Sequence, residues 1–191
     1  MKLYERLPNC IEIDGRKYRL NLDFRNVLKM MDVMQRKDIV PLARDYLTLK
    51  CVMYRPPKDY RKVLYHVMLF LFGENKHMEE KRVTSFAQDA DMIRAAFMQE
   101  YGINLFRAKL HWFEFTALLY NLPNGNKYTE VIGIRSKPIP PATKYNQAER
   151  EELIKAKAAY AIEYTEEERE RNYNNALKRV FSDMKTIINR K

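Results

Sequence analysis

The chain has 191 residues, of which 46% are hydrophobic and 31% charged, and its formal net charge is +10. This balance is typical of a soluble globular protein and argues against a disordered chain; the length suits one domain with a sizeable core, or one domain with an appendage. The longest nearly uncharged run, VLYHVMLFLFG from Val63, is shorter than the roughly 20 apolar residues of a membrane span. We therefore expect no membrane interaction.

Composition also argues against several classes of function. Only five glycines occur, and the phosphate-binding patterns GxGxxG and GxxxxGK[ST] are absent. The basic residues form no run of five, whereas a nucleic-acid groove concentrates positive charge on one face. The two cysteines form no CxxC pair and the start resembles no export signal, so we expect a reducing cytoplasm.

The N-terminal segment predicts a β-hairpin. CIEI (10–13) and KYRL (17–20) flank Asp14-Gly15, a dipeptide that tolerates the positive φ angles of a type I′ turn. Two strands alone are marginally stable, so we expect the hairpin to pack on another element.

Helical periodicity dominates the rest of the chain. Asp23 is placed to cap the first helix, Pro41 suits the first turn of the second, and Gly102 suits a helix C-terminus. A proline-rich segment, SKPIPPATKYN (136–146), then reads as an extended connector. The helices predicted before the connector span residues 24–36, 40–54, 58–72, 90–101 and 106–121, and a short helix or turn is predicted over 128–135.

Two more helices are predicted after the connector. The first covers EREELIKAKAAYAIEY, and Thr165 with Glu168 forms a capping box that opens the second. We therefore predict a mainly α fold, a helical bundle-like domain with a small N-terminal β-hairpin and a C-terminal helical pair. Residues 1–136 would hold the hairpin and helical core. Residues 137–191 would hold the connector and the C-terminal helices, packed on the core or on a partner.

The stretch LHWFEF (110–115) contains the only tryptophan, and it places His111 three positions before Glu114. On a helix these two would share one face, as a proton-transfer pair or a partial metal site would. We interpret the segment instead as a central core helix, on which the pair forms a hydrogen bond or ion pair along a narrow polar strip. His111→Gln is then expected to leave folding nearly unchanged. The apolar residues of this helix fall into two sectors: Trp112, Phe115, Leu119 and Leu122, and Phe113, Ala117 and Tyr120.

No residue carries a predicted catalytic, metal-binding or cofactor-binding role. The three histidines occur without HExxH, HxH or a cysteine pair, and no GxSxG motif is present. Cys51 lies mid-helix among apolar residues, where a thiol behaves as a small hydrophobe. We expect a non-enzymatic protein without a cofactor.

The last predicted helix carries an amphipathic stripe that extends over about two heptads. The stripe packs on its own domain or offers a surface to another chain, and the sequence leaves both alternatives open. The candidate partner-binding residues are Tyr173, Leu177, Val180, Phe181, Met184, Ile187 and Ile188.

Several motifs in order resemble a known phage family. They are IDGRKYRLNLDFR (13–25), DADMIRAAFMQEYGINL (89–105), LHWFEFTALLYNLP (110–123), VIGIRS (131–136) and KAKAAYAI (155–162). They resemble a tail-module protein family of siphophages that infect Gram-positive hosts. The core signature comprises Tyr101, Gly102, Leu110, Trp112 and Phe115. The chain departs from the family pattern at Phe113, where a second tryptophan is usual, and at Asn104, where an acidic residue is commoner.

The resemblance implies a tail assembly chaperone that acts in the host cytoplasm. Such proteins are encoded near the tape measure gene and are thought to bind the tape measure protein while tail tube subunits gather round it. A homo-oligomer is left open. The alternatives are a virion structural component, such as a tail completion or connector subunit, and a basic helical nucleic-acid-binding protein.

Overall fold

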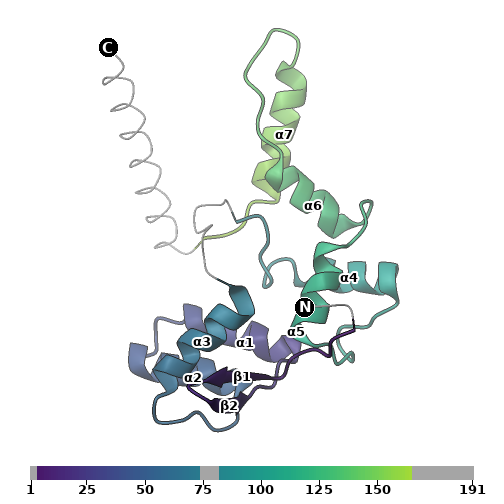
Figure 1. Ribbon diagram of the computed structural model, residues 1–191. Coiled ribbons are helices and arrows are strands. Elements are labelled where there is room, and N and C mark those ends of the chain that lie inside the picture. Colours follow the sequence, from purple (N-terminus) through teal and green to yellow (C-terminus); the bar gives the residue numbers. More distant parts are fainter. Residues whose placement is uncertain (1–3, 74–81, 165–191) are drawn as a thin grey trace, which may run out of the picture. The chain divides into compact units, whose positions relative to one another are not determined.

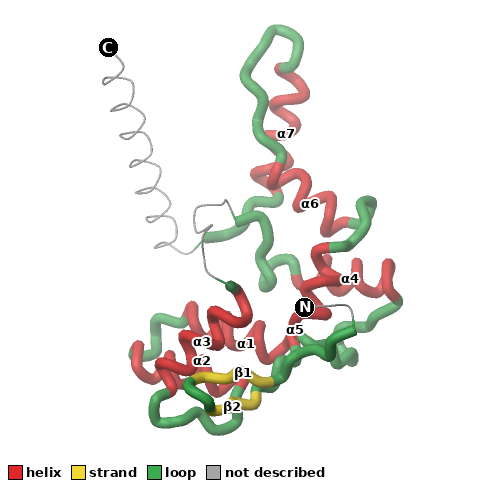
Figure 2. Tube along the Cα trace, viewed as in Figure 1, coloured by secondary structure: helices red, strands yellow, loops and turns green. Residues whose placement is uncertain are grey.

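The computed structural model describes residues 4–73 and 82–164. These residues form seven helices and one two-stranded sheet, which confirms the mainly α fold with an N-terminal hairpin (Figures 1 and 2). The second helix of the predicted C-terminal pair lies outside the described residues. The chain divides into two compact units, Met1–Ile132 and Gly133–Lys191, and the boundary expected after residue 136 stays a prediction.

The hairpin begins the first unit. Strands β1 (Cys10–Ile13) and β2 (Arg16–Arg19) pair antiparallel, with Ile13 opposite Arg16. The turn residues have the positive φ angles that a type I′ turn requires, 50° at Asp14 and 74° at Gly15. Alternate residues of β1 are buried, and β1 packs on helix α3 (Figure 1). The hairpin therefore gains the support that an isolated pair of strands lacks.

Three helices follow and pack in chain order. They are α1 (Phe24–Gln35), α2 (Pro41–Val52) and α3 (Tyr60–Phe72). Asp23 caps α1 because its carboxylate accepts a hydrogen bond from the Arg25 backbone N–H at 3.0 Å. The completely buried aliphatic residues of these helices are Val27, Met30, Leu49, Val52, Val63 and Val67.

Helices α4 (Ala90–Tyr101) and α5 (Trp112–Tyr120) complete the core of this unit. Helix α4 ends in a left-handed C-terminal cap: Gly102 adopts a φ of 64°, and its N–H donates to the Met98 carbonyl at 3.1 Å. The expectation of a helix over 106–121 is wrong at its start, because α5 begins at Trp112. Residues 105–107 form a turn instead, and His111 forms an antiparallel bridge with Asp23 before α1.

Helices α6 (Lys127–Ser136) and α7 (Gln147–Ala159) flank the proline-rich connector. None of the residues of α7 is buried, and two hydrogen bonds join its C-terminal end to that of α6. Arg135 Nε donates to the Tyr160 carbonyl at 2.7 Å, and Lys157 Nζ donates to the Arg135 carbonyl at 2.8 Å. At the C-terminal end of each helix, a backbone carbonyl thus accepts a hydrogen bond from a cationic side chain of the other helix. None of the helices in the described residues is long and apolar enough to cross a membrane.

Candidate partner-binding groove

A cluster of aromatic rings lies beneath the candidate site. The Phe115 ring is at its centre, stacked on Phe24 at 4.7 Å and on Phe97 at 5.4 Å between ring centroids. Trp112 lies at 5.9 Å and Phe86 at 6.2 Å from the same ring. Such offset and edge contacts add stability beyond the burial of apolar area. Helix α1 and helix α4 are therefore joined through one side chain of α5.

His111 does not pair with Glu114, so the predicted hydrogen bond or ion pair between them is wrong. His111 is the N-cap of α5, and its Nδ1 accepts a hydrogen bond from the Phe113 N–H at 3.2 Å. Its Nε2 lies 2.9 Å from the Pro8 carbonyl oxygen. Since an N–H only donates and a carbonyl only accepts, these two contacts fit the tautomer with its proton on Nε2. Glu114 is exposed, and no hydrogen bond or ion pair joins it to the described residues.

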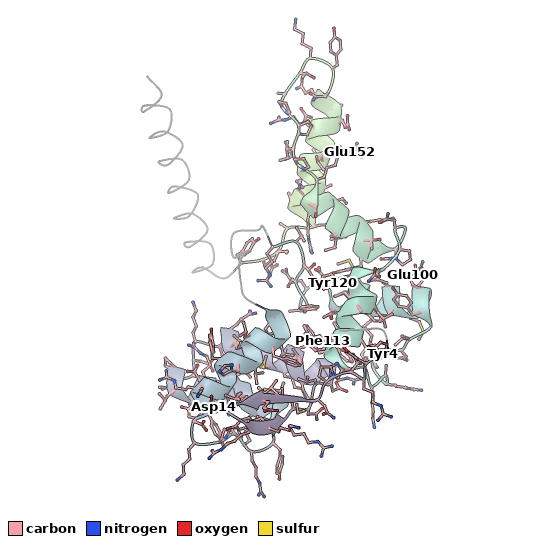
Figure 3. The ribbon with its side chains drawn as sticks, viewed as in Figure 1. Tyr4, Asp14, Glu100, Phe113, Tyr120 and Glu152 are labelled. Carbon is pink, nitrogen blue, oxygen red and sulfur yellow. The ribbon has the colours of Figure 1, made fainter. Side chains whose placement is uncertain are left out.

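The two apolar sectors predicted for this helix have different outcomes. Trp112, Phe115 and Leu119 are buried, as expected. In the second sector Ala117 and Tyr120 are exposed, and Phe113 is half-buried with its ring 5.5 Å from that of Phe70 (Figure 3). The shorter helix therefore has one buried face and not two.

An apolar groove of about 300 Å³ lies above the aromatic cluster. One wall comes from α1 and the other from α4 and the turn before it; the segment after Gly102 closes one side. Phe24 and Phe115 contribute buried surface at the floor, whereas Leu28 is half-buried. The apolar lining residues are Phe24, Leu28, Phe86, Ala90, Ile93, Leu105, Phe106 and Phe115.

Charged side chains flank this apolar surface. Among the described residues that line the groove, Arg25, Lys29 and Arg94 are cations and Asp32 is a carboxylate. The guanidinium of Arg25 is fixed in the wall, because it donates to the Leu105 carbonyl at 2.8 Å. The groove is thus apolar at its floor and predominantly basic at its edge.

Phe106 is the most exposed apolar residue of the groove. The residue is 72% exposed, and the guanidinium of Arg94 lies 4.7 Å from the ring centroid. Asn104 fixes the local backbone, because its side-chain oxygen accepts from the Phe106 N–H at 3.0 Å. An aspartate would accept the same hydrogen bond, so the acidic residue commoner at this position suits the same turn. The turn presents an aromatic ring to solvent beside a cation.

A second depression, wide and shallow, has a volume of about 550 Å³. It lies where the end of the hairpin meets the start of α5. Asp23 and His111 line it, but both already cap helices. We regard this depression as the weaker candidate for a binding site, because the side chains of Asp23 and His111 already form the hydrogen bonds that cap α1 and α5.

The residues singled out from the sequence have structural positions in the first unit or lie outside the described residues. Leu110, Trp112 and Phe115 are buried, Gly102 terminates α4, and the Tyr101 hydroxyl donates to the Leu118 carbonyl at 2.9 Å. Of these, only Phe115 lines the groove. The C-terminal stripe, Tyr173, Leu177, Val180, Phe181, Met184, Ile187 and Ile188, lies outside the described residues.

The described residues present little other reactive chemistry. In the parts of the chain that the structure describes, no group of three or more histidine, cysteine or acidic side chains could hold a metal ion. Cys51 is half-buried in α2, and its Sγ lies 3.4 Å from the Leu47 carbonyl oxygen. Desolvation raises the pKa of this thiol, which keeps it protonated and unreactive at neutral pH.

Comparison with known families decides the affiliation of the chain. Residues 3–162 match the model of a family described as bacteriophage Gp15 protein, and this range covers most of the sequence. The chain belongs to the bacteriophage Gp15 family. No curated protein and no solved structure matches the chain significantly. The matched range includes every groove residue and ends before the C-terminal stripe.

Proposed function

We propose that this phage protein is a tail morphogenesis factor, a tail assembly chaperone that binds the tape measure protein in the host cytoplasm. The observation that carries the proposal is an open apolar groove with an exposed aromatic residue in a member of a phage family. Apolar grooves accept the apolar face of an amphipathic helix, and aromatic residues often dominate the binding energy of such surfaces. No enzymatic activity and no cofactor form part of this proposal.

The resemblance noted in the sequence supports the choice of partner. Ordered motifs across most of the chain resemble the tail-module family, and we expect the long helical tape measure protein to expose an apolar stripe until tail tube subunits cover it. A protein that covers such a stripe keeps its partner soluble. Tail tube protein is a second expected partner, and self-association remains open.

Co-expression with the tape measure protein of the same phage tests this function. We expect the two proteins to co-purify, and we expect the tape measure protein to move from the insoluble to the soluble fraction when this chain is present. Failure of both effects would remove the chaperone proposal.

Purified virions discriminate the chaperone from a virion structural component. A chaperone leaves before the tail is complete, so we expect no peptides of this chain when particles are examined by mass spectrometry. Peptides in a fixed ratio to tail proteins would favour a tail completion or connector subunit instead.

A further inference from the structure

We infer that the groove between α1 and α4 recognises a helix whose apolar stripe is flanked by acidic side chains. This inference rests on the proposed role in binding a helical partner, and it adds the chemistry that selects the partner. It follows from the shape of the groove and from the sign of the charges beside it.

The walls favour a helix over an extended peptide. Apolar wall residues recur at helical spacing, Phe24 and Leu28 on α1 and Ala90 and Ile93 on α4. Two such faces with a channel between them can pack a third helix, whose side chains insert between the wall residues. No strand of the described residues lines the groove, so an extended peptide finds no sheet edge to pair with.

The volume limits what else could bind. About 300 Å³ is the lower end of the range for small-molecule sites, and the floor is formed by tightly packed core rings. Such a space accommodates a few aliphatic side chains inserted from above. The apolar floor also offers no donor for a phosphate, which disfavours a nucleic-acid backbone.

The charged residues at the edge of the groove form its rim, and they determine the sign of the charge that a partner should carry. Lys29 is exposed, and no hydrogen bond or ion pair joins it to the described residues, so its ammonium is available. Arg94 pairs with Asp91 at 2.7 Å, but the Asp91 side chain is 95% exposed, and such pairs contribute little to stability. Arg94 can therefore exchange Asp91 for a partner carboxylate while it still covers Phe106. Asp32, the single carboxylate among the described residues that line the groove, would repel an acidic residue only at its own end of α1.

Binding of two matched peptides to the full chain tests the inference. Both are helical and share leucines at positions i, i+3, i+4 and i+7; one has glutamates beside the leucines and the other has lysines. By fluorescence anisotropy we expect the glutamate peptide to bind about tenfold tighter or better, because like charges beside an interface are strongly unfavourable. The difference should narrow as salt is added. Equal affinities for the two peptides at low salt would overturn the inference.

Charge reversal on the rim sharpens the test. The double substitution Lys29→Glu with Arg94→Glu should abolish or invert the preference. The matched control, Lys17→Glu with Lys50→Glu, makes the same change in net charge at exposed residues outside the groove and should keep the preference. Lys29→Arg with Arg94→Lys keeps the charges and should behave as the parent. An equal effect of the rim pair and the control pair would overturn the inference.

The same variants separate this inference from the proposed function. If the rim reversal leaves co-purification with the tape measure protein intact, acidic recognition by the groove is wrong and the chaperone role stands. If the parent chain prefers the glutamate peptide but never co-purifies with the tape measure protein, the groove chemistry stands and the choice of partner is wrong.

Discussion

Phe106 and Phe115 have the same side chain in opposite surroundings. Phe115 is 2% exposed and contacts rings from three other segments, whereas Phe106 projects beside Arg94. Burial gives the first residue a role in stability, and exposure leaves the second free to contact a partner. The two positions therefore allow folding and binding to be tested separately.

Alanine at each position is expected to affect different measurements. Phe115→Ala should lower the free energy of unfolding by about 3–5 kcal/mol, because it leaves a cavity among the rings. Phe106→Ala should change it by less than about 0.5 kcal/mol, as is usual for surface positions. Urea denaturation measures both values, and peptide binding should weaken for Phe106→Ala. A large loss of stability at Phe106 would contradict this assignment.

His111 illustrates how a titratable residue can serve only the fold. Its Nδ1 accepts from the Phe113 N–H and its Nε2 donates to the Pro8 carbonyl, which ties the start of α5 to the N-terminal segment. An imidazolium donates from both nitrogens, so a charged ring could not make the first bond. The expectation that His111→Gln leaves folding nearly unchanged rested on a pair with Glu114 that does not exist.

Substitution of His111 should therefore be costly. His111→Ala should lower the free energy of unfolding by about 1–2 kcal/mol, the usual effect of removing an N-cap. His111→Asn should recover part of this, because asparagine can cap α5 but is too short to reach Pro8. Denaturation curves of the three proteins measure the two contributions. Identical midpoints for the parent and His111→Ala would show that the cap contributes nothing.

The helix and strand boundaries could be predicted where the local chemistry is strong. Asp14-Gly15 predicted the hairpin turn, and Gly102 predicted the end of α4. The start of α5 could not be predicted in the same way. The residues FRAKLH (106–111) contain no glycine or proline, so periodicity alone extends the helix back to Phe106. In the folded chain Leu110 and Trp112 instead form backbone hydrogen bonds with Phe24 and Leu22, and this tertiary pairing overrides helix propensity.

Glycine at the end of α4 provides a test of an element boundary. Gly102 has a φ of 64°, and a Cβ added there would meet nothing within 4 Å. Alanine at this position would therefore strain the backbone without a steric clash against neighbouring residues. We expect Gly102→Ala to destabilise the chain by about 1–2 kcal/mol. The control is Gly133→Ala within α6, where the added Cβ also meets nothing but φ is not positive. That change should be neutral or stabilising by up to about 1 kcal/mol in thermal or urea unfolding.

An ion pair joins the hairpin turn to α3. Asp14, at the tip of the hairpin in Figure 3, accepts a hydrogen bond from Lys62. This hydrogen bond and the lysine charge lower the pKa of Asp14 below its ordinary value of 3.8 and raise the pKa of Lys62 above 10.5. The contribution of Asp14 is therefore lost as the pH falls below that value, and the contribution of Lys62 is lost as the pH rises beyond 10.5. Between these limits the pair is intact.

Titration of Asp14 tests this pair directly. Its carboxyl carbon, followed by NMR, should titrate below the ordinary pKa in the parent and closer to it in Lys62→Met. Added salt should reduce the difference, because both groups are exposed. Asp38, whose pKa is lowered by a hydrogen bond from Arg36, serves as an internal control that Lys62→Met should not move. Equal titration midpoints of Asp14 in both proteins would show that the ion pair with Lys62 does not form in solution.

At the scale of the whole molecule, the sequence predicted the fold class but not the groove. Its lining comes from residues 24–32, 86–94, 105–106 and 115, which no local pattern connects. Phe106 was expected inside a helix, and the exposed ring could not be foreseen until the start of α5 was known. The core residues Trp112 and Phe115 could be predicted because helical periodicity depends only on near neighbours.

The net charge of +10 permits one test of the nucleic-acid alternative. At about 0.15 M ionic strength charges more than roughly 8 Å apart are largely screened, so dispersed cations do not act together. We expect no retention of double-stranded DNA in a gel-shift assay at this salt concentration. If DNA is retained, and if the logarithm of the binding constant falls steeply and linearly with the logarithm of the salt concentration, several phosphate contacts form and the nucleic-acid alternative is supported.

The pairing of the N-terminal segment with the start of α5 has a consequence for synthesis of the chain. The Pro8 carbonyl oxygen lies within hydrogen-bond distance of a histidine ring 103 residues later, and the Phe24 ring stacks on that of Phe115, which is translated later still. On the ribosome α1 therefore emerges with one side of its core surface unmatched and stays so until Phe115 has left the exit tunnel. Contacts so distant in sequence slow folding. The nascent chain would thus itself need protection from aggregation until Phe115 has emerged.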